Sequence, residues 1–287
     1  MPEDTYIVVA IDGTSSREFG YSGGNDEKNK VCVFNESYTR AFHRRVLAPD
    51  TQKYFHHGPD SQITGSDSTE IEQTAWDWLR RRLEYLPNAK VVLVGHSRGG
   101  HIVVNLAIRL SRVRLGGFVP VIRAAPGPGS EPQTFLQPQQ PFQPVHFLGL
   151  YDAVDMTYAL GDTSVVPANV VWFYHALRSR KVGSRKAWGN TGTKTARTDP
   201  DHYVQREFDA THGSVGGAIP EPCDGSMGTE RTLGFVAGGL LGKAIVENAS
   251  GSCDVSLTAE ENAKYGKLAH EFILGGARKA GIPLADR

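Results

Sequence analysis

The segment 91–100 constrains the fold of this chain more than any other part of the sequence. It begins with an apolar, mostly β-branched run, passes through Gly95-His96-Ser97-Arg98-Gly99, and continues into an amphipathic helical pattern. This order predicts a buried strand, a sharp turn with a serine at its apex, and a helix. Glycines two residues from Ser97 suit a strained turn that bulky neighbours would crowd. Such a turn holds the Ser97 hydroxyl above the end of a sheet, as a nucleophile requires.

The rest of the chain predicts strands that alternate with helices. Strands are expected at residues 6–11, 53–57, 90–94, 119–125, 145–151, 169–175 and 203–210, and helices at 35–47, 70–86, 99–112, 229–248 and 257–280. This alternation is typical of an α/β fold, a three-layer sandwich with a mostly parallel central sheet and helices on both faces. Without a repeat or a convincing linker, residues 1–287 are expected to form a single domain. The Pro- and Gln-rich segment 126–144 is expected to be an irregular excursion and is a candidate lid.

Four polar residues come just after predicted strands: Asp12, Ser97, Asp152 and His212. The carboxyl ends of parallel strands lie at one edge of a sheet, so these side chains are expected to share one site. A serine hydroxyl becomes a good nucleophile when an imidazole accepts its proton and a carboxylate orients that imidazole. The sequence therefore predicts a catalytic triad of Ser97, Asp152 and His212. Asp155 and Asp162 are alternatives for the acid, but Asp152 follows its strand most closely.

Two other histidines compete for the role of general base, His175 and His202. His212 is preferred because the chain order serine, acid, histidine is that of α/β-hydrolases. It also comes just after a predicted strand. The glycine-rich run 213–217 behind it would let its loop fold back toward the serine.

An acyl-transfer site also needs backbone N–H groups that stabilise a developing oxyanion. The residue after the nucleophile, Arg98, is expected to supply one of them. The loop after the first strand is expected to supply the second, through Gly13 or Thr14, with the Asp12 side chain orienting that loop. Three side chains are candidates for substrate binding: Asp12, His96 and His57.

The composition argues against several other classes of protein. The formal net charge is 0, so the chain has no overall positive charge that would favour binding to nucleic acid. There is no apolar run of about 18 residues that would span a membrane. Neither C-x-x-C nor H-E-x-x-H occurs, and no metal or cofactor is expected. With no recognised signal peptide and only three cysteines, the sequence predicts a cytoplasmic protein as synthesised, with free thiols; pairing of Cys223 with Cys253 is the alternative.

Several segments also resemble the motifs of a known family. They are Ile11-Asp12-Gly13-Thr14-Ser15-Ser16, Gly95-His96-Ser97-Arg98-Gly99-Gly100, Leu148-Gly149-Leu150-Tyr151-Asp152-Ala153-Val154, His175-Ala176-Leu177 and the run 208–217, F-D-A-T-H-G-S-V-G-G. Together they make the chain similar to the α/β-hydrolase domain family that contains the first class of type VI secretion lipase effectors. The resemblance implies an α/β-hydrolase-like sandwich and a triad of Ser97, Asp152 and His212.

These observations predict a serine hydrolase that cleaves carboxylic esters through an acyl-enzyme. The resemblance implies lipid esters, phospholipids among them, as substrates. It also implies export by a specialised secretion system without a signal peptide, and the candidate lid would make transient contact with a membrane surface. The triad alone leaves open an amidase, a peptidase or a polyester depolymerase, and a non-catalytic binding member of the fold. The oligomeric state is left open.

Overall fold

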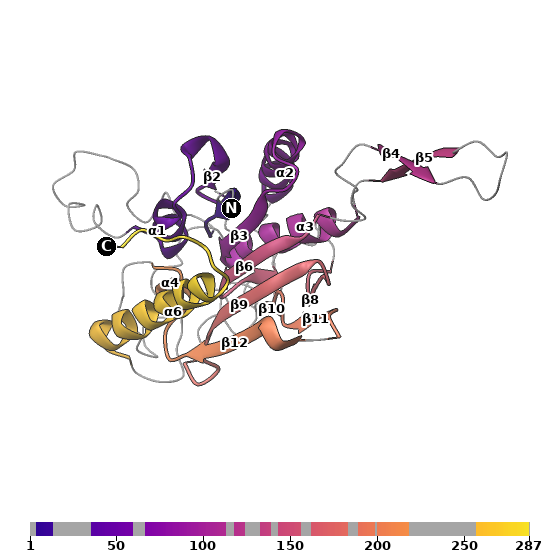
Figure 1. Ribbon diagram of the computed structural model, residues 1–287. Coiled ribbons are helices and arrows are strands. Elements are labelled where there is room, and N and C mark those ends of the chain that lie inside the picture. The colour runs from indigo at the N-terminus through magenta and orange to yellow at the C-terminus, as the bar shows by residue number, and fades with distance from the viewer. Residues whose placement is uncertain are drawn as a thin grey trace.

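A computed structural model describes residues 4–13, 36–59, 67–112, 118–123, 133–138, 143–155, 162–182, 189–198, 200–217 and 257–286. At its centre lies a six-stranded sheet (Figure 1). Its strands, in spatial order, are β12 (Tyr203–Phe208), β9 (Val170–Arg178), β6 (Val145–Tyr151), β3 (Lys90–His96), β1 (Tyr6–Ile11) and β2 (Lys53–His56). Every neighbouring pair in this sheet is parallel, which confirms the predicted sheet.

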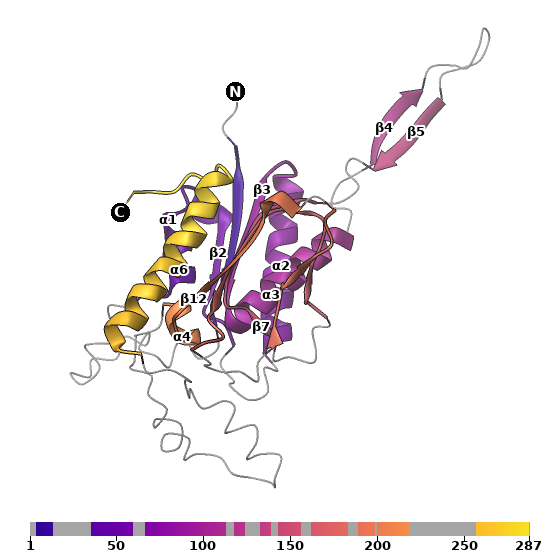
Figure 2. The same ribbon diagram turned by 90° about the horizontal axis from the view of Figure 1, so that it is seen from below.

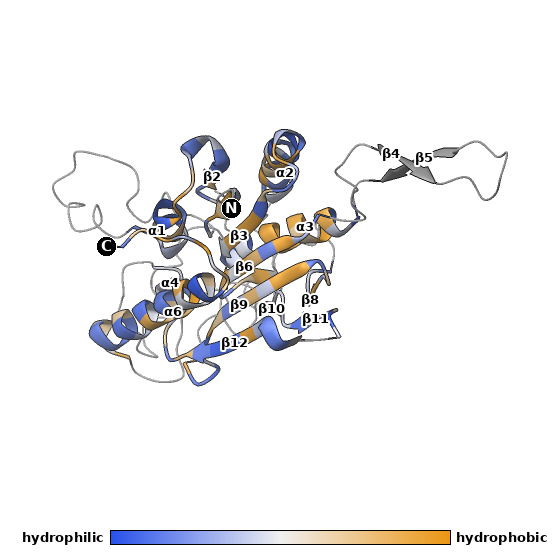
Figure 3. Cartoon of the chain, viewed as in Figure 1, coloured by the Kyte–Doolittle hydropathy of each residue, from blue (hydrophilic) through white to orange (hydrophobic). Residues whose placement is uncertain are grey.

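Helices cover both faces of the sheet (Figure 2). They are α2 (Ser68–Tyr85) and α3 (Ser97–Arg112) on one face, and α1 (Tyr38–Arg45) and α6 (Ala259–Lys279) on the other. In β1, Ile7, Val9 and Ile11 belong to the core with α2 and α3, whereas Tyr6 and Val8 belong to the core with α1 and α6. Burial on both faces explains why the central strands are continuous apolar runs rather than alternating ones. Figure 3 shows this concentration of hydrophobic residues on the inner strands, while the edge strand β12 is mostly hydrophilic.

The strand order creates a topological switch point between β1 and β3. After β1 the chain passes to β2 at one edge of the sheet and then returns to β3 on the other side of β1. In open α/β sheets, ligands bind in the crevice at the carboxyl ends of two such strands. Asp12 and Gly13 follow β1, and Ser97 follows β3, so both lie at this point.

The prediction for the segment 119–144 is wrong in two respects. β4 (Phe118–Arg123) does not join the central sheet but pairs with β5 (Gln133–Pro138), which lies in the segment expected to be irregular. The two form an antiparallel hairpin that stands away from the sheet (Figures 1 and 2). A short apolar run does not reveal its partner, and Pro120 inside β4 is a signal against a central strand, because proline cannot donate to the ladder.

The remaining elements are short. β7 (Val154–Asp155) pairs with β10 (Gly189–Asn190), and β8 (Val165–Val166) pairs with β11 (Lys194–Thr195). One turn of helix, α4 (His212–Val215), follows β12. The helix predicted at 229–248 lies outside the described residues. No helix in the described part of the chain is long and apolar enough to cross a membrane.

Candidate active site

The turn between β3 and α3 holds Ser97 in a strained conformation. Its φ is +54°, a value that L-residues rarely adopt. A Cβ on Gly99 would lie 2.2 Å from the carbonyl oxygens of Ile11 and Asp12, and one on Gly95 would lie 2.5 Å from the Gly99 oxygen. The backbones of β1, β3 and α3 therefore approach so closely that only glycine fits on either side of the serine. The helix begins at Ser97 itself, two residues before the predicted start.

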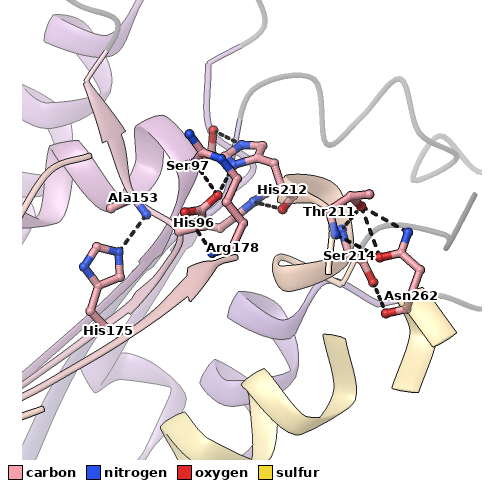
Figure 4. A network of polar contacts seen from close by, with 10 residues as sticks. His96, Ser97, Ala153, His175, Arg178, Thr211, His212, Ser214 and Asn262 are labelled. Atoms are coloured by element: carbon pink, nitrogen blue, oxygen red, sulfur yellow. Dashed lines mark hydrogen bonds and ion pairs between the residues drawn. The ribbon is translucent and has the colours of Figure 1, made fainter. Parts of the chain in front are cut away.

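Ser97, His212 and Asp152 lie in one hydrogen-bonded chain. Figure 4 shows Ser97 and His212 within this network. The His212 Nε2 is 2.8 Å from the Ser97 Oγ, and the His212 Nδ1 is 2.7 Å from the Asp152 Oδ2. All three residues are at most 3% exposed. With the Nδ1 proton donated to the carboxylate, Nε2 is free to accept the serine proton, which is the arrangement that general-base catalysis needs.

The carboxylate of Asp152 is held by further donors. The Arg178 Nη1 lies 2.6 Å from Oδ2, and the Arg178 backbone N–H donates to Oδ1 at 3.2 Å. Burial alone would raise the pKa of Asp152, but the hydrogen bond and charge of His212 together with the charge of Arg178 outweigh it. The pKa of this carboxyl therefore falls well below its usual range. Asp152 stays ionised at any pH at which the protein would work.

The alternatives weighed for the acid and the base lie elsewhere. His175 is fully buried, and its Nε2 accepts a hydrogen bond from the Ala153 N–H at 3.1 Å, which supports the turn after Asp152 (Figure 4). Burial lowers the pKa of His175 to about 4, so this ring is neutral near pH 7. His202 stacks on Trp172 at 3.6 Å between ring centroids. Asp162 is exposed, and Asp155 lies in β7.

A helix from the end of the chain positions the loop that carries His212. Asn262, in the first turn of α6, accepts a hydrogen bond from the Thr211 N–H at 2.9 Å through its Oδ1. Its carbonyl oxygen accepts a second from the Ser214 Oγ at 2.7 Å (Figure 4). Asn262 was not predicted from the sequence. The only available signal was a polar residue on the buried side of an amphipathic helix, where Asn262 is 1% exposed.

The loop after β1 packs directly against the serine turn. A Cβ on Gly13 would lie 2.9 Å from the Ser97 Cβ. The backbone N–H of Arg98 belongs to the first turn of α3, where N–H groups have no partner inside the helix. Gly13 and Arg98, the predicted oxyanion donors, are thus both next to the nucleophile, and the Gly13 N–H also interacts with the Asp12 carboxylate. Thr14 lies outside the described residues.

Asp12 turns away from the serine and toward α1. The Oγ of Ser37, the N-cap residue of that helix, donates to the Asp12 Oδ2 at 2.5 Å. Asp12 is 1% exposed, and burial raises its pKa to about 7 against the opposing effect of the Ser37 hydrogen bond. These contacts fit the predicted role of orienting the loop better than the predicted role in substrate binding.

The other two candidates for substrate binding differ in position. The His96 ring lies 4.9 Å from the His212 ring, and its Nε2 is 3.2 Å from the His212 carbonyl oxygen. A Cβ on Gly13 or on Gly216 would meet His96 atoms at 2.6 and 2.3 Å, so this ring fills the space between the two loops. His57 contacts Phe55 edge to face at 5.1 Å. His96 is therefore part of the site's framework.

The described residues contain no group of three or more His, Cys, Asp or Glu side chains that could hold a metal ion. No protein-family model matches the sequence, and no curated protein matches it. Among solved structures, the chain is similar to the Tle1 effector bound to the VgrG spike from the Type 6 secretion system. The TM-score is 0.43 at 12% identity, over 100% of this chain and 75% of that one. These values do not assign the chain to a family, and the α/β fold stands on its own sheet order and layers.

Proposed function

We propose that this protein is a serine hydrolase that cleaves carboxylic esters. The observation that carries the proposal is the hydrogen-bonded chain from Ser97 through His212 to Asp152, at the carboxyl ends of the strands. The strained serine turn supports the same conclusion. The proposal also takes the backbone N–H groups next to Ser97 as the oxyanion site, which a triad needs to stabilise a tetrahedral intermediate.

In the proposed mechanism, the Ser97 Oγ attacks the ester carbonyl while the His212 Nε2 accepts its proton. The oxyanion that forms is stabilised by the backbone N–H of Arg98 and by an N–H of the Gly13–Thr14 loop. His212 then gives the proton to the departing alcohol, which leaves an acyl group on Ser97. Water attacks this acyl-enzyme with His212 again as the base, and the serine is regenerated.

Lipid and phospholipid esters are the substrate class that we propose within this activity. The motif resemblance supports this choice. We also propose, on the same resemblance, transient contact with a membrane surface and export by a specialised secretion system. Asp12, His96 and His57 remain the proposed residues around the substrate, with Asp12 and His96 acting through the loops that they hold. The same machinery would cleave an amide, so the substrate class needs its own experiment.

The first test is covalent labelling by a fluorophosphonate probe. Attack by the Ser97 Oγ forms an O–P bond and expels fluoride, while the serine proton passes to His212, so labelling reports an activated serine without knowledge of the substrate. Stoichiometric labelling is expected for the wild type and loss of labelling for Ser97→Ala and His212→Ala. Ser111→Ala, on the same helix as Ser97, is the matched control and should label normally.

A folded wild-type protein that stays unlabelled would contradict the proposal and favour a non-catalytic binding role. If labelling succeeds, rates on p-nitrophenyl butyrate, on the corresponding p-nitroanilide and on phospholipid vesicles separate the substrate classes. Hydrolysis of the anilide at a rate similar to that of the ester would favour an amidase. Hydrolysis of the soluble ester without release of fatty acid from vesicles would exclude phospholipids.

A further inference from the structure

The carboxylate of Asp152 receives two charged or chargeable donors on a single oxygen. Its Oδ2 lies 2.6 Å from the Arg178 Nη1 and 2.7 Å from the His212 Nδ1. The side chains of Arg178, His212 and Asp152 are 8%, 4% and 0% exposed, so water screens this cluster little. A guanidinium keeps its charge over the whole working pH range. Arg178 therefore places a permanent positive charge beside the proposed base, and this charge offsets the negative charge of Asp152.

This charge opposes the protonation of His212. In a Ser-His-Asp arrangement, the carboxylate stabilises the imidazolium that forms when the serine loses its proton. Here Arg178 neutralises part of that negative charge, and it would stand beside the imidazolium as a like charge on the same oxygen. A like charge within about 4–6 Å disfavours the charged form of a titratable group. His212 is accordingly more reluctant to hold a proton than it would be with Asp152 alone.

We propose that Arg178 is a positioning residue that keeps His212 neutral, and thus able to act as a base, at acidic pH. Arg178 does not contact the reacting atoms and acts through Asp152, which its Nη1 and its backbone N–H hold from both carboxylate oxygens. The inference rests on the proposed function, since it needs His212 to accept the serine proton. It predicts activity that extends to lower pH than the same triad would show without the guanidinium.

Other polar groups around the site are few in the described part of the chain, and each is accounted for in the test. Beside the cluster lie His96 at the end of β3, Asp12 after β1, His175 on β9, and the uncharged Asn262 on α6, which holds the His212 loop. His175 accepts a hydrogen bond from a backbone N–H, and burial lowers its pKa to about 4, so it is neutral over most of the tested range. Burial raises the pKa of Asp12 to about 7, so Asp12 titrates within that range and is tested together with the His96 ring.

The test is the rate of fluorophosphonate labelling between pH 4.5 and 9 for the wild type, Arg178→Gln and Arg178→Lys. In the plot of labelling rate against pH, the acidic limb is the range in which the rate falls as His212 becomes protonated. Arg178→Gln removes the charge and keeps a donor, so this limb should move up by about one pH unit. Labelling below the limb should then fall about tenfold, with a smaller change on the alkaline plateau. Arg178→Lys keeps the charge and should hold the limb close to its wild-type position. A uniform loss at every pH, with the limb unmoved, would overturn the proposal and leave Arg178 a structural role.

Two further measurements keep the outcomes separate. Arg178→Gln should displace the limb equally in the wild type, in a His96→Phe background and in an Asp12→Asn background. Disappearance of the displacement in one of these backgrounds would assign the titration to His96 or to Asp12, respectively. If neither Arg178→Gln nor Arg178→Lys folds, the low-field NMR signal of the His212 Nδ1 proton decides in the wild type. A midpoint well below the ordinary histidine value of about 6.5 supports the proposal, and one at or above it overturns it. Failure of the proposed function differs from all of these, because the wild type would then not label at all.

Discussion

Two residues of the site, Ser97 and Asp152, adopt positive φ angles of 54° and 42° without being glycine. Each such conformation costs on the order of 1–3 kcal/mol and persists only where the surroundings impose it. Two backbone hydrogen bonds hold the chain at Asp152. Its N–H donates to the Ala176 oxygen at 2.7 Å, and the N–H of Ala153 donates to the His175 Nε2. Both strained residues stand where a side chain must leave the end of a strand and turn toward His212. In the part of the chain that the structure describes, the residues other than glycine with positive φ are thus at positions that define the site.

The serine turn should not tolerate a methyl group at Gly99. Gly99→Ala would place a Cβ 2.2 Å from the backbone oxygens of Ile11, the last residue of β1, and of Asp12, so α3 and the end of β1 must separate. We expect a loss of about 1–3 kcal/mol in the free energy of unfolding, measured by urea denaturation, and a labelling rate that falls with it. Gly275→Ala is the matched control, because no atom lies within 4 Å of its Cβ and Gly275 is inside α6. There the change should be neutral or stabilising by up to about 1 kcal/mol. Equal effects at the two glycines would contradict the close approach.

Buried Asp12 makes stability depend on pH. Its pKa is about 7 in the folded protein against 3.8 for the free group, so the folded state binds a proton that the unfolded state releases between these values. The stabilisation of the folded state by protonated Asp12 is therefore complete below pH 3.8 and is lost as the pH rises through 7. Asp12→Asn mimics the protonated form. Between pH 4 and pH 8 its free energy of unfolding should therefore rise by about 2–4 kcal/mol relative to that of the wild type.

Urea denaturation at pH 5 and pH 8 measures this difference directly. Asp50→Asn serves as a comparison, because the Asp50 side chain is 99% exposed and its replacement should shift stability by the same amount at both pH values. If the difference in the free energy of unfolding between Asp12→Asn and the wild type does not change with pH, the Asp12 carboxyl is not protonated in the folded state.

The helix α6 is far from the triad along the chain, but it holds the segment that carries His212. Its capping box, Thr258 with Glu261, fixes the start of the helix, and Asn262 lies one residue further on. Asn262 holds the loop between β12 and α4 through Thr211 and Ser214. The base is therefore positioned by an element that contains none of the triad.

Asn262→Ala should lower activity without touching the triad. The loss leaves the part-buried Thr211 N–H without its acceptor, at a cost of about 1 kcal/mol, and lets the His212 loop move. We expect the labelling rate to fall about tenfold or more, since small displacements of a catalytic group are costly. Asn262→Asp keeps an oxygen acceptor at this position and should retain more of the rate. A normal rate in Asn262→Ala would show that α4 and β12 alone place His212.

The sequence was informative where local pattern and topology coincide. A strand followed at once by a polar residue marks a strand end, and parallel pairing brings such ends to one edge, which is why Ser97, Asp152 and His212 could be predicted to meet. Arg178 and Asn262 could not, because their contacts join residues 26 and 51 positions apart and leave no local signature. The pairing of β4 was missed for the related reason that an apolar run does not specify which segment it will pair with.

At the scale of the whole molecule, the six-stranded sheet and its two helical layers form one body, and the β4–β5 hairpin contributes nothing to the sheet. β4 and β5 pair with each other and with no strand of the central sheet. A two-stranded hairpin is marginally stable in water by itself. Replacing residues 118–138 with a short Gly-Ser linker should therefore leave the midpoint of thermal unfolding of the sheet nearly unchanged.

The same deletion tests whether this excursion is the lid or membrane contact that its position in the sequence predicts. If the hairpin binds a lipid surface, its removal should lower fatty-acid release from phospholipid vesicles about tenfold, the equivalent of about 1.4 kcal/mol of surface affinity. Hydrolysis of p-nitrophenyl butyrate should stay within about twofold, because this small ester reaches Ser97 without a bilayer and the deletion leaves the ladder between β3, β6 and β9 intact. Equal losses on both substrates would contradict a membrane role and make the hairpin part of the pocket; no loss on either would place its function outside catalysis.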